Sequence, residues 1–119
     1  LLFSIPGVKG VEFGDGFACA EHYGSQRNDS IVDATGKTAT NNEGGINGGI
    51  SNGNEIVVRV AIKPTPSIAR SQQTYNFDTQ RVESLTIGGR HESCIARRAM
   101  VVVEAMVAFA LADLKLQNR

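Results

Sequence analysis

The apolar stretch Ala-Met-Val-Val-Val-Glu-Ala-Met-Val-Ala-Phe-Ala-Leu-Ala, residues 99–112, decides the fold class of this 119-residue chain. It carries one charged side chain, Glu104, and the longer segment from Arg97 to Leu116 contains neither glycine nor proline. Such a segment predicts a helix with almost no polar face, which should be buried on most of its sides. Because these 14 residues are too few to span a bilayer comfortably, we expect a core helix covered by a sheet.

Strand and turn signals alternate upstream of this helix. Strands are predicted at residues 8–13 and 54–62, and one or two more within residues 72–87. Residues 1–5 and 17–23 predict helical turns, the second of them stopped at Gly24, and residues 28–43 predict an exposed excursion or hairpin. Together these elements predict an α+β fold in which an antiparallel sheet packs on buried helices, within residues 1–119 as a single domain or fragment.

The composition excludes some classes of function. Hydrophobic residues make up 41% of the chain, as in soluble globular proteins, and 12 basic side chains balance 12 acidic ones. A neutral balance argues against general binding to nucleic acid or a membrane surface, but it leaves room for a local basic pocket. Cys19 and Cys94 lie far apart and no CxxC pair exists, which opposes a zinc site; a reduced cytosolic pair is expected.

A glycine-rich segment is the first candidate for a ligand site. Residues 44–53 contain five glycines, which permit positive φ angles and a close approach of a ligand to the main chain. The spacing is neither GxGxxG nor a phosphate-binding P-loop. A flexible surface loop would also be rich in glycine, but the interleaved Ile46 and Ile50 favour a structured segment.

Two further segments carry groups that bind anions. Lys63-Pro64-Thr65-Pro66-Ser67 sets a cation and two hydroxyls at a strand end, a combination that suits phosphate. Gly89-Arg90-His91-Glu92 places a guanidinium, an imidazole and a carboxylate in succession before the apolar helix. When each segment is read alone, a plain strand exit is the better explanation of the first and a charged helix-capping loop that of the second.

Read together and in order, these segments resemble chorismate synthases over essentially the whole chain. The resemblance lies in residues 8–17, 24–25, 28–29, 41–53, 63–68, 89–91, 98–99 and 103–106. It implies a C-terminal portion of the enzyme, with helices sandwiched between antiparallel sheets and a homo-oligomeric, tetrameric assembly. It also implies a missing N-terminal part that carries the family's two catalytic histidines, so that this chain alone would be inactive.

The resemblance further implies an activity, a cofactor and a set of site residues. Chorismate synthase is a cytoplasmic lyase of aromatic amino-acid biosynthesis. It requires reduced FMN, which is thought to lend an electron transiently, and it eliminates phosphate from 5-enolpyruvylshikimate 3-phosphate in a 1,4-anti sense. The implied catalytic carboxylate is Glu92, and Arg90 is implied to contact both the flavin and the substrate. The other implied flavin contacts are Gly7, Gly48, Lys63, Thr65 and Ser67.

The chain departs from the family pattern at two places. Glu92-Ser93 stands where the family usually has Asp-Pro, so the carboxylate arm is longer by one methylene. Pro6-Gly7 stands where Asn-Ala is common, and proline lacks both the side-chain amide and a backbone N–H. These departures keep open a non-catalytic flavin- or phosphate-binding module of the same fold. The apolar helix alone would also suit a structural or interaction role.

Overall fold

The computed structural model describes residues 1–118. The chain divides into two compact units, Leu1–Ala61 and a second that begins at Ile62. Helices occur beside antiparallel strand pairs, which confirms the predicted α+β class. Whether residues 1–119 form a single domain stays a prediction.

The first unit is built around short strands joined by turns. β1 pairs with β4, and β2 pairs antiparallel with β3, with Asn47 opposite Ile50. Ile5 and Val8 are its buried apolar side chains among the described residues. The elements are η1 (Leu2–Ser4), β1 (Val8–Phe13), η2 (Gly16–Glu21), α1 (Gly24–Arg27), β2 (Ile46–Asn47), β3 (Ile50–Ser51) and β4 (Val58–Ile62).

β1 has the predicted bounds, but β4 starts later than the predicted residue 54. The reason lies in the hydrogen bonds of Val57. Its N–H donates to the carbonyl of Gly44 at 3.2 Å, and its carbonyl accepts the N–H of Gly14 at 3.0 Å. The backbone before Val58 is therefore engaged by two turns rather than by a strand partner.

The predicted end of the helix at residues 17–23 is wrong. η2 stops at Glu21, and Gly24, expected to be the stop, is the first residue of α1. Tyr23 separates the two helices because its N–H donates to Oε1 of Gln26 at 2.8 Å and its carbonyl accepts the Gln26 N–H at 2.9 Å. These bonds begin a new helical turn at the point where the sequence suggested an end.

Residues 28–43 form the expected exposed excursion. A single antiparallel bridge joins Ile31 and Thr38. Within the turn between them, Oδ1 of Asp33 accepts the N–H groups of Thr35 at 2.8 Å and Lys37 at 3.3 Å. The side chain of Asp33 thus supplies the hydrogen bonds that close this loop.

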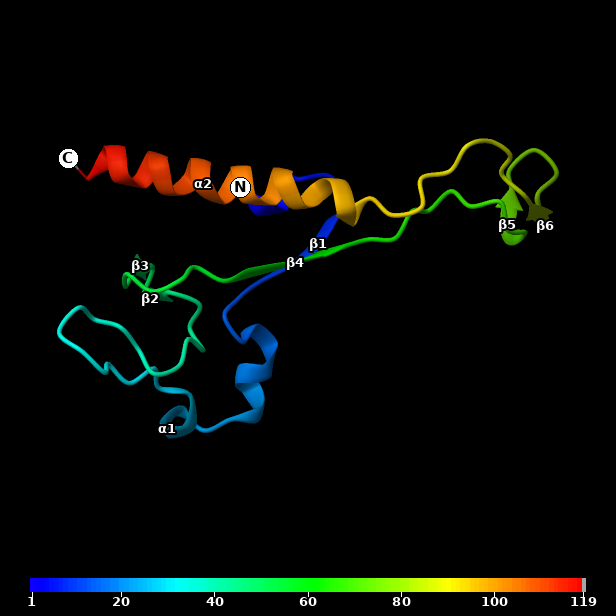
Figure 1. Cartoon of the computed structure of the whole chain (residues 1–119). Helices are drawn as coiled ribbons and strands as arrows, with labels where there is room; N and C mark the ends of the chain where they lie inside the picture. The colour runs from blue at the N-terminus through cyan, green and yellow to red at the C-terminus, as the bar shows by residue number, and fades with distance from the viewer. Residues whose placement is uncertain (119) are drawn as a thin grey trace. The chain divides into compact units, whose positions relative to one another are not determined.

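The second unit holds a hairpin and a long helix. β5 (Gln72–Asn76) and β6 (Arg81–Leu85) pair antiparallel in full register, which confirms two strands within residues 72–87. α2 (Ala96–Gln117) has 22 residues, which confirms the predicted helix. Figure 1 shows it as one continuous helix. No helix within residues 1–118 combines the length and apolarity needed to cross a bilayer.

The expected burial of this helix is wrong for this chain. Ala99 is its one buried residue in the described range, whereas Met100, Val101 and Phe109 are 67%, 71% and 63% exposed. Burial needs an apolar surface opposite, and the residues that the structure describes leave most of the large side chains of α2 uncovered. Among the described residues, most of the large apolar side chains of α2 are thus exposed.

Candidate functional site

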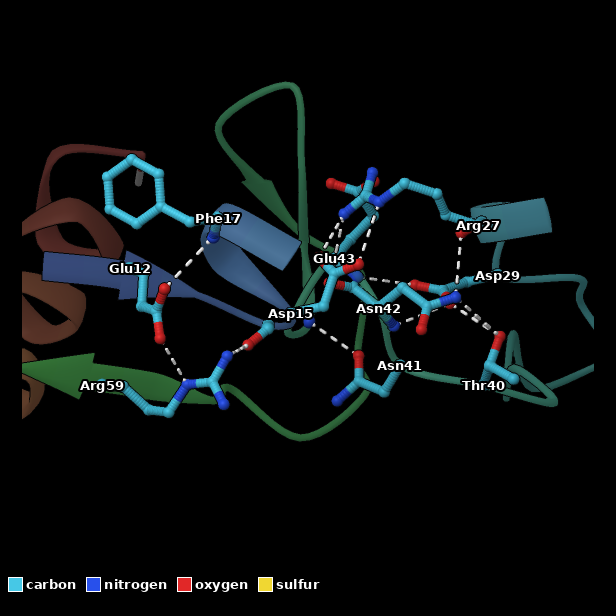
Figure 2. Close-up of polar contacts among 12 residues, drawn as sticks. Glu12, Asp15, Phe17, Arg27, Asp29, Thr40, Asn41, Asn42, Glu43 and Arg59 are labelled. Carbon is cyan, nitrogen blue, oxygen red and sulfur yellow. Dashed lines mark hydrogen bonds and ion pairs between the residues drawn. The ribbon is translucent and has the colours of Figure 1, made fainter. Parts of the chain in front are cut away.

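The first unit contains a cluster of charged side chains around Arg27 (Figure 2). Nε and Nη2 of Arg27 donate to Oδ2 and Oδ1 of Asp15 at 3.0 and 2.5 Å, a bidentate arrangement. Nη1 pairs with Glu43, and Nη2 also reaches the carbonyl of Asn42 at 3.4 Å. Arg27 thus joins the end of α1 to the turn after β1 and to the segment before the glycines.

Asp29 holds the backbone of the same segment. Its Oδ1 accepts the N–H of Asn42 at 2.8 Å and the hydroxyl of Thr40 at 2.8 Å, and its Oδ2 accepts the N–H of Glu43 at 2.9 Å. Figure 2 shows Asp29 and Arg27 near one another, next to Asn42. Asn42 and Glu43 are therefore held by two charged residues, Arg27 and Asp29, that lie two positions apart in the sequence.

The charges of this cluster stabilise one another. The hydrogen bond from the Arg27 side chain lowers the pKa of Asp15 below its ordinary value, and the same contact raises the pKa of Arg27. Partial burial raises the pKa of Asp29, but hydrogen bonds from Glu43, Asn42 and Thr40 outweigh it, so that this pKa is also lowered. The folded structure thus favours both carboxylates in their ionised form.

A second ion pair ties β1 to β4. Nε of Arg59 lies 2.7 Å from Oε1 of Glu12, and Nη2 of Arg59 donates to the carbonyl of Gly14 at 2.9 Å. Oε2 of Glu12 accepts the N–H of Phe17 at 3.1 Å (Figure 2). Glu12 and Arg59 therefore hold the start of η2 on the strand pair.

The glycine segment divides into two parts with different roles. A Cβ on Gly44 would lie 2.3 Å from the backbone nitrogen of Gly14, so that glycine is required for backbone packing. Gly48 and Gly49, with φ angles of 57° and 81°, form the two-residue turn between β2 and β3. Nothing lies within 4 Å of a Cβ built on Gly48. The turn accounts for this glycine, and the open space also leaves its backbone accessible.

Gly7 has a comparable local explanation. It follows Pro6 in the turn between η1 and β1 and has a φ of 88°. The N–H of Val8 donates to the carbonyl of Ile5 at 3.2 Å across this turn. Gly7 and Gly48 belong to the first unit and the other predicted site residues to the second, so their common role in one site stays a prediction.

In the second unit, the structure brings together the two predicted anion-binding segments. Nδ1 of His91 lies 3.3 Å from the hydroxyl oxygen of Ser67, and Nε2 of His91 lies 3.0 Å from the carbonyl oxygen of Ile87. His91 therefore links the exit of β4 to the loop before α2. The two segments are 24 residues apart in the sequence.

The Lys63–Ser67 segment presents groups without partners inside the described chain. The hydroxyl oxygen of Thr65 is buried, and no hydrogen-bond partner within residues 1–118 reaches it. A buried polar atom of this kind costs free energy unless a ligand or water satisfies it. Lys63 and Arg90 are exposed, and neither takes part in an ion pair among the described residues. Both cations are thus available to an anion.

Glu92, the predicted catalytic carboxylate, lies half-buried and pairs with Arg98 in the first turns of α2. Reasoning from the sequence missed this partner, although a spacing of six residues across a helix start is a charge pattern that could have suggested it. The Asp15–Arg27–Glu43 cluster was also missed, and no local pattern indicates it because its members are distant in the sequence.

A model of a known protein family, described as chorismate synthase, matches residues 1–116. The chain belongs to the chorismate synthase family. Chorismate synthases of Chitinophaga pinensis and Archaeoglobus fulgidus are 55% and 53% identical to it over 115 and 119 residues, which is 97% and 98% of this chain. These matches cover 35% and 33% of the two relatives, so the chain spans about a third of their length.

A solved structure supports the same membership in the chorismate synthase family. The structure, titled "Crystal Structure of Chorismate Synthase", is similar with a TM-score of 0.50 and 51% sequence identity. The similarity covers 56% of this chain and 20% of that one. The resemblance inferred from the ordered motifs is thereby confirmed, together with the α+β class.

Proposed function

We propose that this chain is the flavin-side portion of a chorismate synthase, the lyase that eliminates phosphate from 5-enolpyruvylshikimate 3-phosphate to give chorismate. Membership in the family supports this function. The structural observation that carries it is the buried, unpartnered hydroxyl of Thr65, which lies in the same segment as the exposed cation Lys63 and the hydroxyl of Ser67. The remaining two thirds of the enzyme supply the catalytic histidines, so this chain alone is inactive.

The residues of the second unit fit the phosphate of FMN. The ammonium of Lys63 attracts a phosphate group as a point charge, and the hydroxyls of Thr65 and Ser67 donate hydrogen bonds to its oxygens. The unpartnered Thr65 oxygen supports this assignment because a phosphate would satisfy it. Reduced FMN, when bound, supplies the transient electron that assists the departure of phosphate from the substrate.

Arg90 and Glu92 have separate roles in this proposal. The guanidinium of Arg90 is exposed and binds an anionic group of the flavin or the substrate by a charge-assisted contact. The carboxylate of Glu92 takes part in proton transfer beside the flavin, and its ion pair with Arg98 fixes its orientation. In the first unit, the open backbone at Gly48 and the turn at Gly7 are positions at which the flavin approaches the main chain.

The assembled enzyme is a cytoplasmic homo-oligomer in this proposal. A second candidate function is a flavin- or phosphate-binding module without catalysis. The observation that favours it is the pair of departures, Glu92-Ser93 and Pro6-Gly7, at positions that contact the flavin in the family pattern. A longer carboxylate arm would displace the proton-transferring group, while the phosphate contacts of Lys63, Thr65 and Ser67 would be unaffected.

The test uses this chain alone and a hybrid enzyme in which it replaces the matching third of Archaeoglobus fulgidus chorismate synthase. We expect the hybrid to form chorismate with reduced FMN and the 119-residue chain to form none. Turnover by the chain alone would contradict its inactivity. A hybrid that binds FMN at micromolar concentration but does not turn over would establish the binding module instead, and a hybrid that binds no FMN would overturn both candidates.

Arg90→Ala in the hybrid tests the predicted contact directly. Loss of a charge-assisted contact should weaken FMN binding by roughly tenfold or more. Arg81→Ala is the matched control because Arg81 is an exposed arginine on β6, outside the predicted site. Equal FMN affinity in the Arg90→Ala and Arg81→Ala hybrids would remove Arg90 from the site.

A further inference from the structure

His91 uses both of its ring nitrogens, and its two partners differ in kind. Nε2 faces the carbonyl oxygen of Ile87 at 3.0 Å, and Nδ1 faces the hydroxyl of Ser67 at 3.3 Å. A carbonyl oxygen can only accept, whereas a serine hydroxyl can donate or accept. The protonation of His91 therefore determines which way the hydrogen bond to Ser67 runs.

In the neutral ring, the single N–H must lie on Nε2, where Ile87 accepts it. Nδ1 then carries a lone pair and accepts the only proton of the Ser67 hydroxyl. Ser67 in this state offers lone pairs to its surroundings, which suit a donor but not an anion. In the imidazolium, Nδ1 carries a hydrogen and donates to Ser67, so that the hydroxyl proton is free to bind a phosphate oxygen.

We propose that His91 is a positioning residue that sets the donor state of Ser67. Binding of a phosphate monoester by the segment from Lys63 to Ser67 is then coupled to the uptake of one proton by His91. The proposal rests on the proposed function for the identity of the phosphate, that of FMN. It extends that function by assigning His91 a control over phosphate affinity.

The charges around this contact divide between two signs. Lys63 and Arg90, on the two segments that His91 joins, are cationic. Glu92 is the adjacent carboxylate and pairs with Arg98 of α2, so its charge is largely compensated. A bound phosphate dianion adds negative charge near Lys63 and Ser67. It therefore shifts His91 toward the imidazolium, which is the direction that the coupling requires.

The test compares FMN with riboflavin, which lacks the phosphate, in the hybrid enzyme between pH 5.5 and 8.0. Flavin fluorescence gives the dissociation constant of each. At the acidic end of this range, we expect the unmutated hybrid to bind FMN roughly tenfold more tightly than the His91→Gln hybrid does. This difference corresponds to one charge-assisted hydrogen bond. Riboflavin affinity should stay level. The ionisation of the phosphate itself, near pH 6, affects all variants alike and cancels in the comparison.

His91→Gln keeps an amide N–H for Ile87 but cannot change its charge. Ser67→Ala removes the hydroxyl that the proposal places under control of His91. The effect of His91→Gln on FMN binding should therefore vanish in a Ser67→Ala background, a result that a merely structural role of His91 would not produce.

Identical pH profiles for the unmutated and His91→Gln hybrids would overturn the coupling and leave the proposed function intact. An undiminished effect of His91→Gln in the Ser67→Ala background would do the same. Absence of FMN binding at every pH would instead overturn the proposed function, and the coupling with it.

Discussion

Asp15 and Arg27 meet in a bidentate ion pair, with Nη2 to Oδ1 at 2.5 Å and Nε to Oδ2 at 3.0 Å. The two residues are 12 positions apart, one after β1 and the other at the end of α1. Because Arg27 also pairs with Glu43, the loop that leads into the glycine segment is fixed on the turn after β1. This side of the chain is thus organised by charge rather than by an apolar core.

The first prediction concerns acid. The folded-state pKa values of Asp15 and Asp29 lie below the ordinary 3.8. Their contribution to stability is therefore fully present above that value and is lost as pH falls through the lower folded-state values. As the pH is lowered below about 4, we expect the urea concentration at the unfolding midpoint of the 119-residue chain to decrease. The decrease should be less steep in Asp15→Asn and Asp29→Asn. Circular dichroism at pH 2.5–6 measures it.

The control for the acid experiment is Asp78→Asn, a change at an exposed carboxylate outside the cluster. It should leave the pH dependence as it is in the unmutated chain. If the urea midpoints of Asp15→Asn and Asp29→Asn depend on pH in the same way as that of Asp78→Asn, the cluster around Arg27 does not govern the acid stability of the chain.

The second prediction separates two glycines. Gly44→Ala places a methyl group 2.3 Å from the backbone of Gly14 and should destabilise the chain by more than about 3 kcal/mol. Gly48→Ala meets no atom within 4 Å and costs about 1 kcal/mol for its left-handed conformation. Urea unfolding of both variants checks the order, and equal losses of stability would contradict the distinction.

Gly48→Asn then tests whether the flavin approaches this turn. Asparagine tolerates the left-handed conformation and is favoured in two-residue hairpin turns, so stability should be retained. If Gly48 serves a turn alone, FMN binding by the hybrid is also retained. If the flavin approaches the backbone there, we expect the added side chain to weaken FMN binding by roughly tenfold or more at unchanged stability.

Much of the fold could be predicted because the signals are local. The bounds of β1 and the presence of α2 follow from residue type and from the absence of glycine and proline. The helix break at Tyr23 could not be predicted, since it depends on one side-chain bond to Gln26 that competes with a stop signal at Gly24. Local patterns determine elements, but hydrogen bonds chosen in the folded state determine their ends.

The site residues stay a prediction, and the contacts that some of them make could not be predicted from the sequence. Lys63, Thr65 and Ser67 were chosen from chemistry and family pattern, and the buried hydroxyl of Thr65 agrees with a ligand role. The contact between Ser67 and His91 joins residues 24 apart, and the pair of Asp15 and Arg27 joins residues 12 apart. Contacts of this range arise from the folded path of the chain, which no single-sequence pattern encodes.

The third prediction follows from the uncovered side chains of α2. Val101 and Phe109 are 71% and 63% exposed, and exposed apolar groups of this size favour association. We expect the 119-residue chain to self-associate and the double variant Val101→Lys with Phe109→Lys to shift it toward monomer. Asp113→Lys is the control because it adds charge to the same helix at a polar position. Sedimentation velocity distinguishes them, and a monomeric unmutated chain would contradict the prediction.

The last prediction concerns Glu92 and its partner Arg98. The pair is partly exposed, so Arg98→Ala should change the free energy of unfolding by less than about 1 kcal/mol. If Glu92 transfers a proton, Glu92→Gln in the hybrid should lower kcat by about 100-fold or more and leave FMN affinity unchanged, because the amide keeps the shape but not the basicity. Glu92→Asp restores the shorter carboxylate of the family pattern and should retain turnover. Equal kcat for Glu92→Gln and the unmutated hybrid would exclude the carboxylate from the chemistry.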